Sequence, residues 1–329
     1  MAVLVCGGAG YIGSHTVAEL LDKGEEVVVV DNLQKGHRDA VLEGAKLYVG
    51  DLRDEAFMDT VFTENKIDSV IDFAADSLVG ESCVEPLKYY ENNVYGTMCL
   101  LKSMEKHEVK KIVFSSTAAT YGEPESIPIQ ESDKTEPKNP YGETKLSVEK
   151  MLKWCDEAYN IKHVVLRYFN ACGAHKSGEI GEDHSPESHL IPLILQVPLG
   201  KREKIFVFGD DYPTEDGSCI RDYIHVTDLA DAHILAVEKL RKDNTSATYN
   251  LGNGKGFSVK EVIEIARKVT GHPIPAEITD RRAGDPAVLI ASSDRIIEEL
   301  GWNPRYDDLE TIIASAWQWH KNNPEGFEK

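Results

Sequence analysis

A tyrosine and a lysine four residues apart are the side chains of this sequence best placed to move a proton. They are Tyr141 and Lys145, and they follow Asn139, a typical helix N-cap, and Pro140, a typical first residue of a helix. Positions i and i+4 share one face of a helix. The pKa of a phenol is ordinarily about 10, and a nearby ammonium group favours the ionised form. The spacing therefore predicts a tyrosine base whose pKa is lowered by Lys145 together with a cationic cofactor group beside it.

Three hydroxyl side chains, Ser115, Ser116 and Thr117, follow the Val/Ile-rich run Ile112–Phe114. If that run is a strand of an open parallel sheet, they lie at its carboxyl edge, where such sheets bind ligands. A hydroxyl there can hydrogen-bond the substrate oxygen that loses its proton. The Tyr-x-x-x-Lys spacing by itself is more typical of an ordinary amphipathic helix, so its catalytic interpretation depends on a cofactor site nearby.

A glycine-rich loop joins the first apolar run to the first helical pattern, with Gly7, Gly10 and Gly13 in G-x-x-G-x-x-G spacing. Glycines let a pyrophosphate approach the N–H groups at a helix start. Asp31 ends the next apolar run, where a carboxylate accepts both ribose hydroxyls of NAD and repels the 2′-phosphate of NADP. A tight turn without a ligand is the alternative, but strand, glycines, helix and acid in register favour NAD. Asp51 can reach the adenine edge or, nearly as well, cap a helix.

Short Val/Ile-rich runs alternate with helical patterns through the first half of the chain, as in βαβ units around a buried parallel sheet. The first helix is predicted over Tyr11–Lys23 and ends at Gly24. We therefore predict an α/β protein with a doubly wound, Rossmann-type parallel sheet. The predicted strands are Val3–Cys6, Glu26–Val30, Lys46–Val49, Ser69–Phe73, Ile112–Phe114 and His163–Leu166.

The second half is less regular and predicts a smaller α/β substrate domain. Ser258 and Glu261 form a capping-box pattern for a helix that runs to Thr270, and Asp307 or Asp308 caps a final helix. Residues 170–189 lack periodicity, which is typical of a long functional loop. We expect a cofactor domain over residues 1–172 and a substrate domain over 173–329, with chain exchange back to the first domain around 218–252.

The composition of the chain excludes several classes of binding partner. The 329 residues carry 36 Lys and Arg against 56 Asp and Glu, a net charge of −20. A field of this sign works against nucleic acid and anionic membranes as partners. No apolar run is long enough to span a bilayer, and the first residues do not resemble a signal peptide. Six scattered cysteines are typical of free thiols in a reducing compartment, so we expect a cytoplasmic protein.

The sequence resembles the extended short-chain dehydrogenase/reductase family, and within it the UDP-galactose (UDP-glucose) 4-epimerases. The resemblance covers nearly the whole chain. It rests on the strings G-G-A-G-Y-I-G-S at 7–14, V-V-D-N-L at 29–33, V-G-E-S at 79–82, Y-Y-E-N-N-V-Y-G-T at 89–97, P-Y-G-E-T-K at 140–145, R-Y-F-N at 167–170, D-Y-P-T-E-D-G at 211–217, R-D-Y-I-H-V at 221–226 and R-R-A-G-D at 281–285.

The resemblance implies roles for individual residues. Tyr141 is the base for the sugar 4-OH, Lys145 lowers its pKa and holds the nicotinamide ribose, and Thr117 stands where the family has Ser or Thr. The implied NAD-binding residues are Gly7, Gly10, Tyr11, Ile12, Asp31, Asn32, Asp51, Leu52, Phe73, Ala74, Ala75, Asn92, Ser115, Tyr141, Lys145 and Tyr168. The implied substrate-binding residues are Thr117, Tyr141, Asn170, His189, Leu190, Phe206, Val207, Phe208, Arg221, Arg282 and Asp285.

The implied reaction interconverts UDP-galactose and UDP-glucose. Tyr141 takes the 4-OH proton as hydride moves from C4 to tightly bound NAD, the 4-keto sugar turns over, and hydride returns to its other face. A homodimer is a further implication. Three positions depart from the common pattern of the family. Ser77 replaces a lysine, which predicts looser retention of NAD, and His189 replaces an asparagine that touches the sugar. Val288 replaces a bulky tyrosine, so activity on UDP-N-acetylhexosamines is a hypothesis.

Other interpretations are open to test. A nucleotide-sugar 4,6-dehydratase would carry Asp-Glu after Thr117, whereas this chain has Ala118 and Ala119. A UDP-uronate epimerase fits the same motifs, and a nonenzymatic NAD-sensing regulator usually loses the Tyr or the Lys. His175, His184 and His189 match no helical metal-binding spacing, so we expect a polar loop and no metal.

Overall fold

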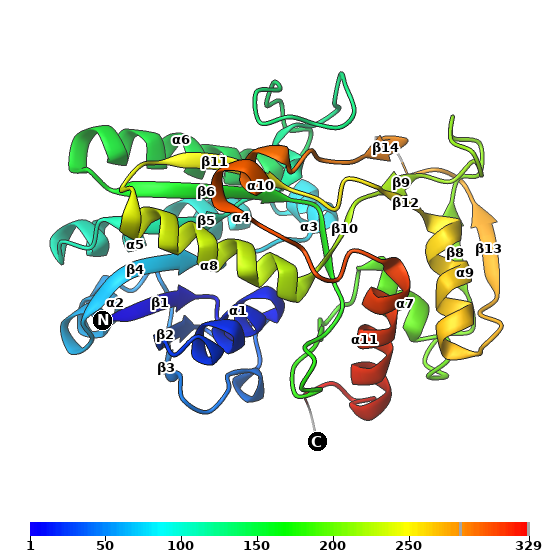
Figure 1. The fold of residues 1–329 in the computed structure, drawn as a ribbon, viewed down its shortest axis with the longest axis horizontal. Coiled ribbons are helices and arrows are strands. Elements are labelled where there is room, and N and C mark those ends of the chain that lie inside the picture. Colours follow the sequence, from blue (N-terminus) through cyan, green and yellow to red (C-terminus); the bar gives the residue numbers. More distant parts are fainter. Residues whose placement is uncertain (283–284, 328–329) are drawn as a thin grey trace.

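A seven-stranded, fully parallel sheet forms the larger part of the molecule (Figure 1). The structure, a computed structural model, describes residues 1–282 and 285–327. The strand order is β11-β6-β5-β4-β1-β2-β3, so the predicted Rossmann-type sheet is confirmed. The strands are β1 (Ala2–Cys6), β2 (Glu26–Asp31), β3 (Lys46–Val49), β4 (Ile67–Asp72), β5 (Lys111–Ser115), β6 (Lys162–Tyr168) and β11 (Ala247–Leu251).

Helices cover both faces of this sheet because its strands are apolar on both faces. Val3 and Val5 of β1 belong to the core beneath α1 (Tyr11–Asp22) and α8 (Val226–Lys242). Leu4 and Cys6 of the same strand belong to the opposite core. The helices over that second core are α2 (Glu55–Glu64), α5 (Gly96–Lys106) and α6 (Pro140–Tyr159).

The strand order reverses between β1 and β4, which lie side by side. Open α/β sheets bind ligands at the carboxyl edge of such a switch point, where the loops after the two strands diverge. Gly7 follows β1 with a φ of +74°, and a Cβ at this position would lie 2.8 Å from the backbone nitrogen of Ala74, after β4. The two loops therefore approach each other closely because residue 7 has no side chain.

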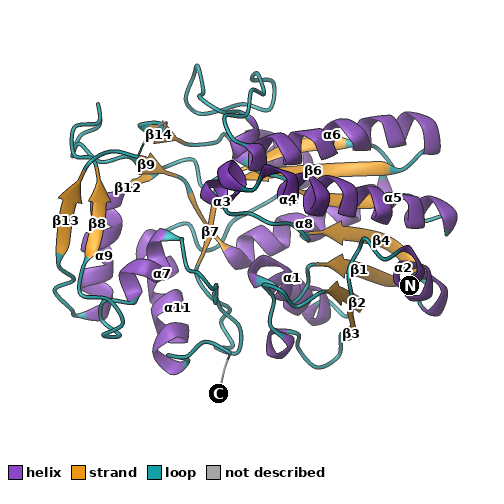
Figure 2. Cartoon of the chain, turned by 180° about the vertical axis from the view of Figure 1, so that it is seen from behind, coloured by secondary structure: helices purple, strands orange, loops and turns teal. Residues whose placement is uncertain are grey.

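The smaller part of the molecule packs around a third core and is joined to the sheet by β7 (Asn170–Cys172), which pairs with β10 (Tyr223–His225) (Figure 2). After β10 the chain returns to the large sheet as α8 and β11. The elements of the smaller part are α7 (Leu190–Leu195), α9 (Val259–Thr270), α11 (Leu309–Asn322), β8 (Ile205–Phe208), β9 (Ile220–Arg221), β12 (Phe257–Ser258), β13 (Ala276–Thr279) and β14 (Val288–Leu289).

Short elements complete the described chain, and α10 packs against the sheet core next to α8. They are η1 (Arg38–Ala40), α3 (Val79–Val84), α4 (Pro86–Tyr89), η2 (Tyr90–Tyr95), η3 (Ala118–Thr120) and α10 (Asp294–Leu300). Within the described ranges, no helix is long and apolar enough to cross a membrane. All six cysteines are free thiols.

Local helix signals held where hydrogen-bonding side chains determined them. Asn139 caps α6 by accepting from the N–H of Gly142 at 2.9 Å. Ser258 and Glu261 form the predicted capping box of α9, which ends at Thr270. Of the two candidates for the final helix, Asp308 is the cap of α11. The first helix ends at Asp22, one residue earlier than predicted, because Lys23 is the C-cap before Gly24.

Candidate active site

Tyr141 and Lys145 lie in the first two turns of α6, beside the carboxyl end of β5. Lys145 is only 4% exposed. Its Nζ donates to the carbonyl oxygen of Ser115 at 2.8 Å and lies 4.8 Å from the ring centroid of Phe114. Burial lowers the pKa of Lys145 to about 8, and the negative charge of Asp72 acts in the opposite direction. A buried amine whose pKa is shifted in this way is typical of a functional site.

Two features of the surroundings of Tyr141 act on its pKa in opposite directions. Burial raises the pKa of its phenol, and a hydrogen bond with the Thr117 side chain lowers it. Desolvation disfavours the phenolate, and the ammonium group of Lys145 is bonded to the backbone of Ser115. The lowered pKa that the sequence predicts involves a cationic cofactor group beside Lys145, so it stays a prediction.

Hydroxyl groups surround this pair, as the Ser/Thr cluster after β5 predicted. Thr117 is the N-cap of η3, where its Oγ1 accepts from the N–H of Ala119 at 3.1 Å. The Oγ of Ser115 and the phenol oxygen of Tyr168, at the end of β6, are 2.5 Å apart. Tyr168 and Tyr141 are close enough that a negative charge on one disfavours ionisation of the other. The structure therefore brings Ser115, Thr117, Tyr141, Lys145 and Tyr168 together.

The start of α1 fits a dinucleotide phosphate. Gly10 is its N-cap, and no side chain caps the first turn among the described residues. Backbone N–H groups at such a start favour an anion. A Cβ on Gly13 would lie 2.2 Å from the carbonyl oxygen of Gly7. Only glycine at this position therefore lets the loop pack against the first turn of α1, which contains Ile12. The phenol of Tyr11 donates to the carbonyl oxygen of Gly173 at 2.6 Å.

The carboxylate predicted to bind the NAD ribose lies at the end of β2. The N–H of Ala9 donates to Oδ2 of Asp31 at 3.0 Å, and the N–H of Leu33 donates to Oδ1 at 2.8 Å. These two bonds orient the carboxylate between the phosphate loop and the turn after β2. Each oxygen retains a second lone pair for a ribose hydroxyl. The N–H donors at the start of α1 and the acceptor oxygens of Asp31 therefore fit NAD.

Asn32 and Asp51 form the outer end of this surface. The amide of Asn32 donates to Oδ2 of Asp51 at 3.1 Å, and Arg53 forms an ion pair with the same oxygen at 2.7 Å. The hydrogen bonds from Arg53 hold the pKa of Asp51 well below its usual range. The alternative role of Asp51 as a helix cap is taken by Asp54, the N-cap of α2. Leu52 is buried next to this pair.

The loop after β4 and the nearby η2 complete the predicted cofactor surface. Phe73 packs on His233 of α8 with ring centroids 4.6 Å apart, and Ala74 and Ala75 follow it. Asn92 lies in the π-helical η2 and is half-buried. The side chain of its neighbour Asn93 donates to Thr144 of α6 at 3.1 Å. Through that bond, η2 is fastened to the helix that carries Tyr141.

The residues predicted to bind the UDP half of the substrate lie mainly in the smaller part of the molecule. The guanidinium of Arg282 lies 4.0 Å from the ring centroid of Phe208. Arg221 forms an ion pair with Asp285. Strand β8 also carries the predicted residues Phe206 and Val207. Ala283 and Gly284, part of the string R-R-A-G-D, lie outside the described residues.

Three further predicted residues lie on the path between the two parts. The amide of Asn170 in β7 donates to the carbonyl oxygen of Asp222 at 3.0 Å. His189 is the N-cap residue of α7, and Leu190 is the first residue of that helix. The Nδ1 of His189 is 2.6 Å from Oε1 of Glu182, a contact that was not predicted.

Sequence reasoning missed a buried ion pair behind the hydroxyl cluster. Arg167 of β6 bonds both carboxylate oxygens of Glu149, and Ser116 donates to the same carboxylate. Arg167 also donates to the phenol of Tyr121 at 2.8 Å. One signal was available, because Glu149 follows Lys145 by four residues and so shares its helix face. The partner on β6 could not be read from local spacing.

Comparisons with known proteins show the family to which the chain belongs. Residues 3–252 match the NAD dependent epimerase/dehydratase family. A UDP-glucose 4-epimerase of Halalkalibacterium halodurans is 67% identical over 327 residues, 99% of this chain and 98% of that protein. A crystal structure of a UDP-glucose 4-epimerase has 60% identity, covers 100% of both chains and has a TM-score of 0.99. The enzyme of Bifidobacterium longum in complex with NAD⁺ and UDP has 45% identity, covers 99% of this chain and 100% of that one, and has a TM-score of 0.94.

Proposed function

The chain belongs to the NAD dependent epimerase/dehydratase family, and we propose that it interconverts UDP-galactose and UDP-glucose at C4 of the sugar. The observation that carries this conclusion is the group formed by half-buried Tyr141 and buried Lys145 and Thr117 at the carboxyl edge of the sheet, beside a helix start that fits NAD. Sequence identities of 67% and 60% to UDP-glucose 4-epimerases, over nearly the full length of the chain, support the same reaction.

The side chains divide the work of the reaction. The phenol of Tyr141 takes the proton of the sugar 4-OH and later returns it, while Thr117 hydrogen-bonds the same oxygen. Lys145 holds the nicotinamide ribose and supplies positive charge near Tyr141. The start of α1 and the carboxylate of Asp31 would hold NAD, which would supply a reversible hydride acceptor for C4 of the sugar. Arg221 and Arg282 hold the UDP half, so that the sugar is free to turn.

The two sugar nucleotides test this directly. The NAD-loaded protein is incubated separately with UDP-galactose and with UDP-glucuronate, and each mixture is analysed for the 4-epimer. We expect UDP-glucose from UDP-galactose, with no net consumption of NAD. Turnover of UDP-glucuronate alone would identify a uronate epimerase instead, and a 4-keto-6-deoxy product would identify a dehydratase. A protein that binds NAD but converts neither sugar would support the regulator interpretation.

A second activity, on UDP-N-acetylhexosamines, follows from Val288. This residue is in β14, opposite Ile220 of β9, and its side chain is smaller than the tyrosine it replaces. A smaller side chain leaves room for an N-acetyl group. Turnover of UDP-N-acetylglucosamine supports the proposal, and the Val288→Tyr variant should lose that activity while it keeps activity on UDP-galactose. No activity on the N-acetylated substrate would refute it.

Cofactor retention, assembly and location are proposed from the sequence. Ser77 is exposed and stands where many members of the family carry a lysine, so NAD should be lost more readily than from a Ser77→Lys variant during washing. We propose a homodimer in the cytoplasm. Light scattering of the NAD-loaded protein measures the mass, and a monomer would refute the assembly.

A further inference from the structure

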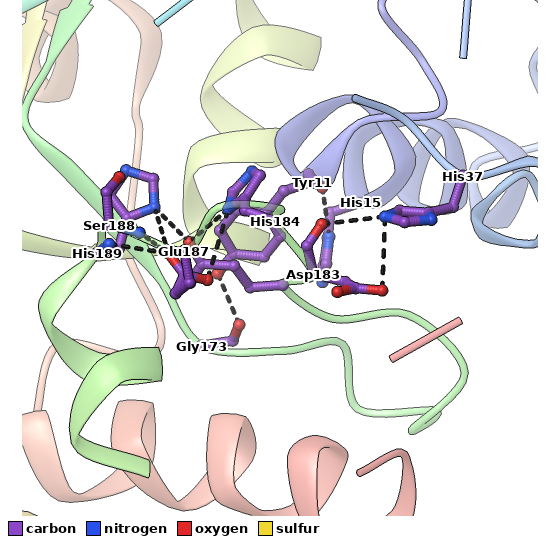
Figure 3. A network of polar contacts seen from close by, with 10 residues as sticks. Tyr11, His15, His37, Gly173, Asp183, His184, Glu187, Ser188 and His189 are labelled. Atoms are coloured by element: carbon purple, nitrogen blue, oxygen red, sulfur yellow. Dashed lines mark hydrogen bonds and ion pairs between the residues drawn. The ribbon is translucent and has the colours of Figure 1, made fainter. Parts of the chain in front are cut away.

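We propose that this protein binds one zinc ion at a cluster formed by Glu182, His184, Glu187 and His189, which we call the His-Glu cluster. Figure 3 shows His184, Glu187 and His189 of this cluster side by side. The four residues lie in the segment before α7. Each presents one ligand atom, and these four atoms all lie within 4.8 Å of one another. The inference does not depend on the proposed reaction, because Glu182, His184 and Glu187 belong to no predicted cofactor or substrate set, and His189, a predicted substrate-binding residue, is left unchanged in the test.

The spacing of the ligand atoms matches a tetrahedral ion. Nδ1 of His189 is 2.6 Å from Oε1 of Glu182, and Nδ1 of His184 is 3.2 Å from the same oxygen. The carboxylate oxygens of Glu187 lie 3.6 Å from Nδ1 of His189 and 3.8 Å from Nδ1 of His184. Zinc bonds of about 2.0–2.2 Å in tetrahedral geometry place neighbouring ligand atoms about 3.3 Å apart. The observed distances lie on both sides of that value.

The hydrogen bonding of the cluster is incomplete without a cation. Nδ1 of both imidazoles lies near one oxygen of Glu182, whose side chain is only 4% exposed, but only His189 makes a hydrogen bond with it. Among the described residues, the buried Nδ1 of His184 has no hydrogen-bond partner, and the ion pairs of Glu182 involve only these two histidines. A zinc ion between the four ligands would use the free lone pair of each neutral imidazole and compensate both carboxylates.

The surrounding structure holds the ligands in place. Oε1 of Glu187 accepts the N–H groups of Ser188 and His189 at 2.7 and 2.8 Å. The ring of His184 contacts that of Tyr11 at a centroid distance of 6.0 Å. The intervening Asp183 points away and pairs with His37 instead (Figure 3). Supporting contacts of this kind orient metal ligands and set their affinity.

The donor set favours zinc over harder cations. Two imidazole nitrogens with two carboxylate oxygens suit zinc, whereas magnesium prefers oxygen ligands in an octahedron. A second group, Glu19, Asp22 and His175, supplies only one imidazole, and the side chain of Asp22 is 59% exposed. Spacing along a helix does not predict the His-Glu cluster, because a loop rather than a helix brings its members together.

The location indicates a structural role for the ion. The segment that carries the His-Glu cluster runs from the loop after β7 to the start of α7, and it contacts the first turn of α1 through Tyr11. Zinc would therefore fasten the loop of the smaller part against the phosphate-binding helix. A ligand that binds the folded state alone raises the free energy of unfolding with the logarithm of its concentration above Kd.

The test uses tag-free, NAD-loaded protein that is treated with a chelator, dialysed and titrated with zinc chloride. Calorimetry and elemental analysis should give one zinc per chain, and zinc should raise Tm, whereas magnesium should do neither. His184→Asn and Glu187→Gln should weaken zinc binding by more than about 10-fold. His107→Asn is the matched control, because Nε2 of His107 contacts Asp59 at 2.7 Å at a site with no second histidine; it should bind zinc normally.

Cobalt(II) gives a readout that does not depend on stability. In place of zinc it should show the intense visible absorption bands of a four-coordinate ion, and these bands should be lost in His184→Asn. Far-UV circular dichroism and NAD content check that each variant is folded. Zinc far below one ion per chain, or equal zinc affinity in the wild type and in folded His184→Asn, would overturn the proposal.

Discussion

Tyr141 and Lys145 occupy neighbouring turns of α6, yet burial affects the two in opposite ways. It raises the pKa of the phenol and lowers that of the ammonium group. Both shifts favour the neutral forms, as desolvation always does. A positive charge close to the phenol is therefore needed before it can act as a base near neutral pH. The nicotinamide of NAD, when bound, supplies such a charge.

Removal of the phenol tests the role of Tyr141. We expect Tyr141→Phe to lower kcat by about 10²–10⁴ because the proton acceptor is lost, while UDP binding is retained. Stopped assays of UDP-galactose epimerisation and calorimetry with UDP measure the two effects. Tyr159→Phe is the control, since Tyr159 lies exposed at the end of the same helix. Near-normal turnover in Tyr141→Phe would exclude it as the base.

Two adjacent arginines provide a matched comparison for substrate binding. Arg282 stacks on Phe208, whereas Arg281 lies 4.1 Å from the ring centroid of Tyr212 and pairs with Asp211. A charged hydrogen bond contributes about 1.5–3 kcal/mol, so Arg282→Ala should raise KM for UDP-galactose by about 10- to 100-fold with a smaller change in kcat. Steady-state kinetics measure this, and Arg281→Ala should change KM little. Equal effects of the two substitutions would contradict the assignment.

At the scale of elements, the start of α1 depends on close backbone approach. Gly7 and Gly13 are where the chain permits it: a Cβ on Gly13 would lie 2.2 Å from the carbonyl oxygen of Gly7 and 2.8 Å from the Cα of Gly8. Neither atom can move without displacing the loop. The same loop presents the free N–H groups of the first turn. The geometry of one loop therefore determines both packing and phosphate binding.

Gly13→Ala should damage both properties. Overpacking of this kind costs about 1–3 kcal/mol, and the displaced loop should also lower the NAD content of the purified protein. Urea unfolding and chromatography of released nucleotide measure these effects. Gly80→Ala is the matched control: Gly80 lies in α3 with no heavy atom within 4 Å of an added Cβ, so it should be neutral or stabilising. Unchanged stability and NAD content in Gly13→Ala would contradict the argument.

At the scale of the whole molecule, the two parts are not consecutive halves of the chain, because the chain passes back from the smaller part to the large sheet. After β10 of the smaller part, α8 and β11 return to the large sheet. Helix α8 packs along α1 and carries His233, whose ring contacts Phe73 and Tyr168. The net charge of −20 does not prevent anion binding, because the start of α1 and the arginines are local sources of positive potential.

Buried histidines make the free energy of unfolding depend on pH. Burial lowers the pKa of His233 from 6.5 to about 4. Between these values the unfolded chain binds a proton that the folded chain does not, so the free energy of unfolding decreases as pH falls from 6.5 toward 4. His15 and His225 act in the same direction. Asp72 and Asp222, whose pKa values burial raises to about 6, oppose them.

Comparison with His233→Leu isolates one group. The wild type should lose stability relative to this variant by up to about 1.4 kcal/mol for each pH unit between 6.5 and 4. Urea unfolding at several pH values measures the difference. Parallel pH profiles for the two proteins would show that His233 is not the titrating group.

Local sequence determined the parts of this protein that local interactions stabilise. The alternation of apolar runs and helical patterns predicted the parallel sheet, because the hydrophobic periodicity of a buried strand or an amphipathic helix is visible within a short stretch of sequence. The caps of α6, α9 and α11 were predicted for the same reason, since each is a hydrogen bond within one turn. The phosphate loop belongs to this class as well.

Only the tertiary structure decided which side chains meet across the chain. It paired Arg167 with Glu149, joined the amine of Lys145 to the carbonyl of Ser115 and gathered the His-Glu cluster in an aperiodic loop. It also determined the desolvation that raises the pKa of the Tyr141 phenol. These outcomes depend on desolvation and on contacts between distant segments, and both arise only when the chain has packed, so no local spacing can encode them.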